Sequence, residues 1–348
     1  MADRRSSRGM VAFSVTFYIT TALIMVFVNK WVLNSVDLPF SLLWFQVTFA
    51  VILLHISAAF GLFRLPTVQK DICIGLIPLV LINVLGLSFN TICLQYVDAS
   101  FYQVARALVL PFTVLFSFIF LNQKSSLMVL LSCLIVCTGF FVGVSSERLT
   151  LSMLGVFFGV CSSVSTALHA IVIKKSLDVV KGNTMELVYY NNLLSAIAFA
   201  PIILLAGEQN DIFMLFSDSN PTSLSDSDSN SARTFFIGIF VTGFFGFLIN
   251  IAGFLQIKVT SPVTHMVSSA FRGVVQTVLG AILFKEILTS GRVGGIFIIL
   301  FGSCLYTWFK DRENRKLKAL EISEKLEKGE LNENEKIYLG RNNEKENV

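Results

Sequence analysis

The chain has 348 residues, of which 54% are hydrophobic and 14% charged, whereas a soluble protein carries about 25% charged residues. The last 39 residues, 310–348, hold 10 of the 27 Lys and Arg and 10 of the 23 Asp and Glu, so the rest is poorer still in charge. No stretch of domain size has a soluble composition, which excludes a globular head on a single anchor. The composition predicts an all-α polytopic membrane protein.

Ten apolar runs are long enough to cross roughly 30 Å of hydrocarbon as helices. They lie at 11–31, 40–61, 72–94, 99–121, 126–145, 152–173, 186–206, 234–256, 262–284 and 291–309. The first run follows three arginines but lacks a small-residue cleavage site, so it is expected to be a retained signal anchor. All six cysteines fall inside these runs, which indicates packing residues rather than a disulfide framework or a metal site.

Basic residues near the ends of the spans predict the orientation. With a cytosolic N-terminus, the cytosolic side receives fifteen such Lys and Arg and the opposite side receives five. We therefore expect both termini in the cytosol, with residues 1–10 as the N-terminal segment and 310–348 as a charged tail. The loop 207–233, rich in Ser, Asp and Asn, is expected to be a flexible linker in the lumen.

The fourth and ninth spans look like counterparts, because each has a similar entry and exit and carries one arginine near mid-membrane, Arg106 or Arg272. A duplicated unit of five spans enters the membrane in the opposite orientation the second time. The sequence therefore predicts two inverted five-helix repeats, 11–145 and 152–309, an arrangement found in many secondary transporters.

Arg106 and Arg272 are the most informative residues, because no Asp or Glu lies deep in any span to pair with them. An arginine at the centre of a membrane helix costs at least a few kcal/mol, so it persists where it faces a cavity or a partner. One interpretation is bonding to backbone carbonyls or snorkelling. The other is binding of an anionic substrate, and phosphate suits the planar guanidinium fork.

Further polar residues within the spans favour a cavity for a large polar solute. Tyr189, Tyr190, Asn191 and Asn192 lie about one turn into the seventh span, where they could read and stack a nucleobase or hydrogen-bond between helices. Other polar residues lie near span ends: Asn29, Lys30, Tyr102, Gln103, Thr264 and His265. No enzyme signature is present, and we expect no catalytic residue, cofactor, metal or nucleic-acid partner.

Four segments together resemble the nucleotide-sugar transporters of the drug/metabolite transporter superfamily, and among them the GDP-fucose carriers of the Golgi. The segments are Met25–Leu33, Phe89–Arg106, Tyr189–Asn192 and Leu255–Ser268, the last followed by Gln276 and Thr277. The resemblance extends over nearly all ten spans.

The resemblance implies exchange of lumenal GMP for cytosolic GDP-fucose by alternating access. It implies that Tyr190, Asn191 and Asn192 read the guanine and ribose, and that Arg272 meets the phosphates where the family usually has Lys. Ser268 and Ser269 stand where the family has a Ser-Gly pair. Residues 269–272 read Ser-Ala-Phe-Arg, whereas the GDP-mannose carriers have Gly-Ala-Leu-Asn-Lys here. This difference favours GDP-fucose over GDP-mannose as the substrate. The predicted substrate-binding set is Arg272, Tyr190, Asn191, Asn192, Tyr189, Arg106, Lys30, Asn29, Tyr102, His265, Ser269 and Gln276.

Two alternatives remain open at this point. One is a carrier of another nucleotide sugar, GDP-mannose or a UDP-sugar, on the same fold. The other is a membrane scaffold or receptor that transports nothing and whose polar residues only join helices. The expected partners are the GDP-sugar, GMP and the lipid bilayer, and whether the chain forms a homodimer is left open.

Overall fold

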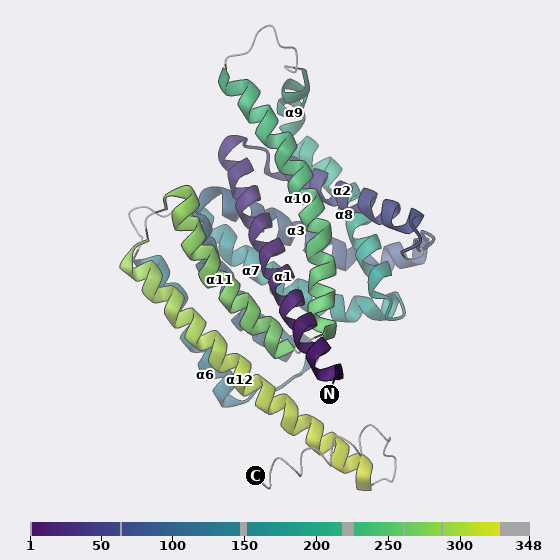
Figure 1. Ribbon diagram of the computed structural model, residues 1–348, viewed down its shortest axis with the longest axis vertical. Helices are drawn as coiled ribbons and strands as arrows, with labels where there is room; N and C mark the ends of the chain where they lie inside the picture. Colours follow the sequence, from purple (N-terminus) through teal and green to yellow (C-terminus); the bar gives the residue numbers. More distant parts are fainter. Residues whose placement is uncertain are drawn as a thin grey trace.

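The computed structural model describes residues 2–62, 65–146, 152–217, 226–259, 262–286 and 288–327, and all regular structure in these residues is helical (Figure 1). In chain order the helices are α1 (Ala2–Ser35), α2 (Pro39–Ala59), α3 (Lys70–Tyr96), α4 (Ala99–Arg106), α5 (Val109–Leu121), α6 (Leu127–Ser145), α7 (Met153–Val179), α8 (Thr184–Ala206), α9 (Glu208–Ser217), α10 (Asp226–Val259), α11 (Pro262–Phe284) and α12 (Ser290–Glu327). The predicted all-helical fold class is confirmed for this part of the chain.

Eight of the ten predicted spans correspond to helices long and apolar enough to cross a membrane. In α10 and α11 the apolar stretches among the described residues are shorter, Arg233–Ile249 and Phe271–Phe284. The eighth and ninth spans therefore remain predictions.

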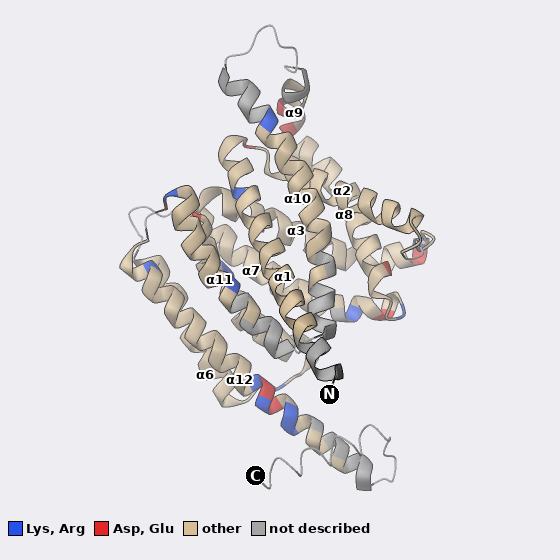
Figure 2. Ribbon diagram, viewed as in Figure 1, with Lys and Arg blue, Asp and Glu red and all other residues tan. Residues whose placement is uncertain are grey.

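The outer surface of the bundle is apolar, as contact with lipid requires. Large hydrophobic side chains such as Phe118, Leu134 and Phe297 are exposed. Most charged residues lie instead near helix ends or on the part of α12 that extends beyond the bundle (Figure 2). The bilayer, rather than water, is the solvent to which this surface is matched.

Helices from the two predicted halves pack directly on one another. α1 packs along α10, α3 along α7, α2 along α8, α6 along α12, and α4 against α11. The largest cluster of buried side chains combines residues of the first half, such as Phe101 and Val104, with Phe235, Ile296 and Ile299 of the second. Neither half forms this core alone.

Two glycines of α7 let it approach the α3–α4 corner closely. A Cβ atom at Gly159 would lie 2.7 Å from the Cβ of Ala105, and one at Gly155 would lie 3.0 Å from the Cβ of Tyr96. Gly155 and Gly159 therefore form a packing surface, since small residues permit such approaches in membranes.

Replacing Gly159 by valine should destabilise the folded bundle by about 1–3 kcal/mol, because the added methyl groups force α7 away from α4. Thermal unfolding of the purified protein in detergent measures this change. Gly294→Ala is the matched control, since no atom lies within 4 Å of a Cβ at Gly294. Equal melting temperatures for the two variants would contradict the close packing.

The span predicted at 99–121 is broken into α4 and α5, which the hydropathy pattern did not predict. Pro111 has no N–H to donate to Ala107, and its ring clashes with that carbonyl. The chain instead forms hydrogen bonds that span three residues rather than four, from Ala107 N to Val104 O and from Leu110 N to Ala107 O, at 3.2 and 3.3 Å. The break therefore directly follows Arg106, the last residue of α4.

Helices extend into both ends of the linker expected at 207–233, which the sequence analysis did not predict. Gly207 ends α8 in the left-handed region at φ 79°, after which α9 runs from Glu208 to Ser217 and α10 begins at Asp226. Residues 218–225 lie outside the described part of the chain. All six cysteines are free, in agreement with their interpretation as packing residues.

Candidate functional site

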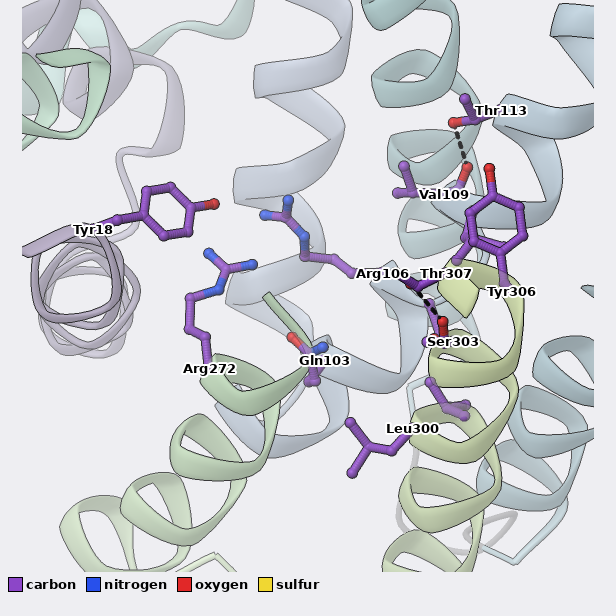
Figure 3. Close-up of a pocket in the computed structure, with 13 residues that line it drawn as sticks. Tyr18, Gln103, Arg106, Val109, Thr113, Arg272, Leu300, Ser303, Tyr306 and Thr307 are labelled. Carbon is purple, nitrogen blue, oxygen red and sulfur yellow. Dashed lines mark hydrogen bonds between the residues drawn. The ribbon is translucent and has the colours of Figure 1, made fainter. Parts of the chain in front are cut away.

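Arg106 and Arg272 line one cavity of about 260 Å³ inside the bundle (Figure 3). Side chains of α1, α4, α5, α11 and α12 surround it. Polar groups contributed by these helices include Tyr18, Gln103 and Thr307. Figure 3 shows the two guanidinium groups and the Tyr18 hydroxyl directed toward the same space. The arginines of the two counterpart spans, 166 positions apart in sequence, thus meet in three dimensions.

The cavity is positively charged. Arg272 is 8% exposed, and its Nε has no hydrogen-bond partner in the described part of the chain. Its guanidinium lies 6.0 Å from the centre of the Tyr18 ring, a weak stabilisation for a buried charge. Among the described residues, neither Arg106 nor Arg272 has a carboxylate within 4 Å. Two unneutralised cations on one internal cavity, Arg272 buried and Arg106 half-buried, are suited to hold a polyanion.

Tyr102, one turn before Arg106 on α4, positions the Arg106 side chain. The Tyr102 hydroxyl accepts a bond of 3.1 Å from Arg106 Nη1 and itself donates to Asn90 Oδ1 on α3. Ser162 on α7 donates to the same Asn90 oxygen at 3.1 Å. Three helices therefore fix the guanidinium, and Tyr102 acts here by orienting Arg106. Arg106 also borders a second cavity, of about 240 Å³, between α3 and α7.

Lys30 does not line either of these cavities, because it binds the C-terminal end of α3. It is 7% exposed, and its ammonium donates to the carbonyls of Leu94, Gln95 and Val97 at 2.8, 3.3 and 2.8 Å. These are carbonyls that the end of a helix leaves without partners. Its neighbour Asn29 accepts a bond of 2.7 Å from Gln46.

Charged groups from the second half of the chain hold the start of α4. The Glu286 carboxylate accepts from the backbone N–H groups of Ala99 and Ser100 at 2.7 and 3.0 Å. Arg292, which is 3% exposed, pairs with Asp98 at 2.9 Å and donates to Ser100 Oγ at 2.5 Å.

Gln276 also binds α4, donating to Ala99 O at 2.8 Å. We call Lys30, Asp98, Gln276, Glu286 and Arg292 the corner cluster, because all five bind at the α3–α4 corner. Lys30 and Gln276 were expected to contact substrate, and in this structure both hold backbone instead.

The polar residues of α8 line neither cavity. Tyr190 is fully buried, and its hydroxyl donates to Thr67 O at 2.8 Å and accepts from Gln69 N at 2.9 Å. Asn192 donates to Val188 O of its own helix at 2.8 Å. Tyr190 thus anchors the segment that precedes α3.

Asn191 differs from its neighbours, since its Oδ1 is buried without a partner in the described chain. Tyr189 is 5% exposed and packs with its ring 5.6 Å from that of His55. His265 and Ser269 lie in α11, but their side chains are outside the described part of the structure.

Glu208 is a buried carboxylate that the sequence analysis missed. It is 6% exposed and accepts from the N–H groups of Phe40 and Ser41 at 3.0 and 2.7 Å, and from the Ser41 hydroxyl. It therefore caps the N-terminus of α2. Burial raises the pKa of the Glu208 carboxyl above its ordinary value, although the bonds from Ser41 and Phe40 oppose that rise.

Because the pKa of Glu208 is higher in the folded state, folding favours its protonated form. The melting temperature should therefore fall as pH rises from about 4.3, the unfolded value, through the raised folded value. Glu208→Gln should lack this part of the pH dependence, whereas Asp211→Asn, an exposed site on the same helix, should keep it. Identical pH profiles for wild type and Glu208→Gln would contradict the assignment.

Comparisons with known proteins identify the class. The model of the Triose-phosphate Transporter family matches residues 9–307. A GDP-fucose transporter of Caenorhabditis elegans is 35% identical over 88% of this chain and 84% of its own. GDP-fucose transporter 1 of Mus musculus is 32% identical over 88% of this chain and 85% of its own. A Drosophila melanogaster protein named "GDP-fucose transporter, Golgi" is 30% identical over 87% of this chain and 90% of its own.

The fold is also shared with a solved structure titled "Crystal structure of protein", with a TM-score of 0.51 over 88% of this chain and 98% of that one. At 16% identity this likeness shows the fold alone. The described helices include eight long and apolar enough to cross a membrane, and the family match places this bundle among membrane transporters. The chain belongs to the Triose-phosphate Transporter family, within which it is a member of the nucleotide-sugar transporters.

Proposed function

We propose that the protein imports GDP-fucose into the Golgi lumen in exchange for GMP by alternating access. The observation that carries the proposal is the cavity in which Arg106 and Arg272 meet without a carboxylate among the described residues. The names of the relatives, GDP-fucose transporters at 30–35% identity, support the substrate. Import of this sugar nucleotide would supply lumenal fucosylation.

The arginines would bind the phosphates of both exchange partners. Each guanidinium can donate two parallel hydrogen bonds to phosphate oxygens, and the surrounding low dielectric strengthens the attraction. GDP-fucose and GMP both bring phosphate to this site, so one pair of cations serves transport in either direction. Release is possible because water reaches the cavity when it opens.

Two inverted five-helix repeats would provide the alternation. In such a repeat α1 corresponds to α7, α2 to α8 and α3 to α10. Each contact between two helices should then have a counterpart between the two corresponding helices. The counterpart of the contact α1–α10 is α7–α3. The counterpart of the contact α2–α10 is α8–α3. Both contacts and both counterparts are observed. The pairs α2–α8 and α6–α12 each map onto themselves. This correspondence supports the repeat and the rocking of one half against the other.

Four members of the corner cluster lie at the span ends that the predicted topology assigns to the lumen, and Gln276 lies about two turns inside its span. The bonds of the cluster join α1 and the second half to the α3–α4 corner. We therefore assign the cluster to closure of the lumenal side, where it would break and re-form during each cycle. Asn191 and Asn192 stay in the proposal as groups that read the guanine from α8.

Exchange in proteoliposomes tests the proposal. Vesicles containing the purified full chain and preloaded with GMP should take up GDP-fucose, whereas vesicles without internal GMP should not. Uptake of GDP-mannose or a UDP-sugar alone would select another nucleotide sugar. Absence of nucleotide exchange altogether would leave the scaffold interpretation.

A further inference from the structure

The second cavity, between α3 and α7, contains polar groups without an assigned role. Its polar lining consists of Asn83, Asn90, Arg106, Ser165, Thr166 and His169, and its volume is about 240 Å³. Of the described lining residues, Arg106 alone is shared by this cavity and the first. Among the described residues that line it, none is acidic and Arg106 is the one permanently charged group.

The register of α3 against α7 places these groups in order. The helices run antiparallel, with Asn90 bonded to Ser162 and Gly86 facing Ser165, where an added Cβ would lie 3.3 Å from the serine Cβ. Continuing this register brings Asn83 level with His169. Asn83 and Asn90 are separated by two turns, or about 10 Å. The cavity therefore has a cationic end at Arg106 and a neutral polar end at Asn83 and His169.

The uncharged polar groups along this cavity retain unused hydrogen-bonding capacity. Asn83 donates through Nδ2 to Ser195 Oγ at 3.0 Å, which leaves its Oδ1 as an acceptor. Asn90 accepts through Oδ1 from Tyr102 and Ser162, which leaves its Nδ2 as a donor. His169 Nε2 is buried and has no partner in the described chain.

Such groups cost free energy inside a membrane protein unless something bonds them. If these polar side chains served only to join α3 to α7, they would hydrogen-bond one another across the two helices, as Ser162 and Asn90 do. They face a cavity instead. The ligand that satisfies them has a neutral body of about 10 Å with donors and acceptors, and an anionic group at the Arg106 end. A nucleoside phosphate has this chemistry.

We propose that the cavity between α3 and α7 seats the nucleoside of the exchanged nucleotides, with its phosphate at Arg106 and its base at Asn83 and His169. This inference rests on the proposed function, in which GDP-fucose and GMP share one nucleoside. Amide and imidazole groups match the alternating donors and acceptors of a base edge. Ser195, which bonds Asn83, lies one turn from Asn191 on α8, so the two base-reading sets adjoin.

Binding to the purified full chain in detergent, measured by calorimetry, tests this assignment without requiring transport. Asn83→Leu and His169→Leu should each weaken GMP binding at least about 10-fold, because each leaves a base atom unbonded. Both should leave the affinity for inorganic pyrophosphate within about 2-fold, since that anion needs only the arginines. Preserved pyrophosphate binding also shows that the variants are folded. In both variants the ratio of the affinity for GMP to the affinity for UMP should also fall.

Thr138→Val is the matched control, because its hydroxyl bonds only its own helix on an exposed face, and it should bind both ligands as wild type does. Unchanged GMP binding in both leucine variants would overturn the inference while leaving the proposed exchange intact. Weakened binding of fucose 1-phosphate with unchanged GMP binding would also overturn it, because the cavity would then hold the sugar. Failure of the wild-type protein to bind GMP would contradict the proposed function, and this inference with it.

Discussion

Arg272→Ala should reduce GDP-fucose exchange at least about 100-fold, equivalent to about 2.7 kcal/mol, while the protein remains folded. The variant removes one of two cations from the cavity, and with it a bidentate contact to phosphate. Arg272 is buried without a carboxylate partner among the described residues, so its removal also relieves an unfavourable charge. We therefore expect the melting temperature without substrate to stay constant or rise.

The combination of lost transport and retained stability distinguishes a binding residue from a packing residue. Arg272→Lys should keep part of the activity, because it retains the charge but loses the planar fork. Arg312→Ala, in the exposed extension of α12, is the control and should exchange normally. Wild-type exchange by Arg272→Ala would contradict the assignment of the cavity.

Arg292→Met should destabilise the protein by about 3–5 kcal/mol, the range seen when one partner of a buried ion pair is removed. Arg292 is 3% exposed and contacts Asp98 and Ser100. Glu286, whose side chain is also 3% exposed, lies 4.0 Å away. Without the arginine, the buried carboxylate loses its cation, and the start of α4 loses one of its anchors.

Thermal unfolding of Arg292→Met and of Arg315→Met measures this difference. Arg315 pairs with Asp311 at 2.8 Å but is 72% exposed, so its loss should change stability by less than about 1 kcal/mol. Combining Asp98→Asn with Arg292→Met should cost less than the sum of the single changes, because the two residues interact. Additive losses would argue against the ion pair.

Hydropathy was sufficient for the helical class and for eight spans, because length and apolar composition are local properties. It also singled out Arg106 and Arg272, since an unpaired charge in an apolar run is visible without knowledge of neighbours. The break after Arg106 was readable in principle from Pro111, whose effect on the carbonyl four residues earlier is also local.

The burial of Arg292 and Glu208 could not be predicted in the same way. Both lie near the ends of spans, where the sequence suggests solvent, and their partners are distant in sequence: Asp98 for Arg292, and Ser41 for Glu208. The cavity between α3 and α7 depends on the register of two helices, which hydropathy does not specify. Tyr190 likewise bonds a segment more than 100 residues away.

The pair of arginines in one cavity has a consequence for the empty carrier. Closing both sides of the bundle over an unloaded cavity would bury two positive charges without an anion, at a cost of several kcal/mol. In the proposed exchange a bound nucleotide would neutralise these charges, so the loaded protein would reorient more readily than the empty one. The charge of the cavity would therefore itself favour one-for-one exchange over leakage, and inorganic anions in the buffer would compete with substrate.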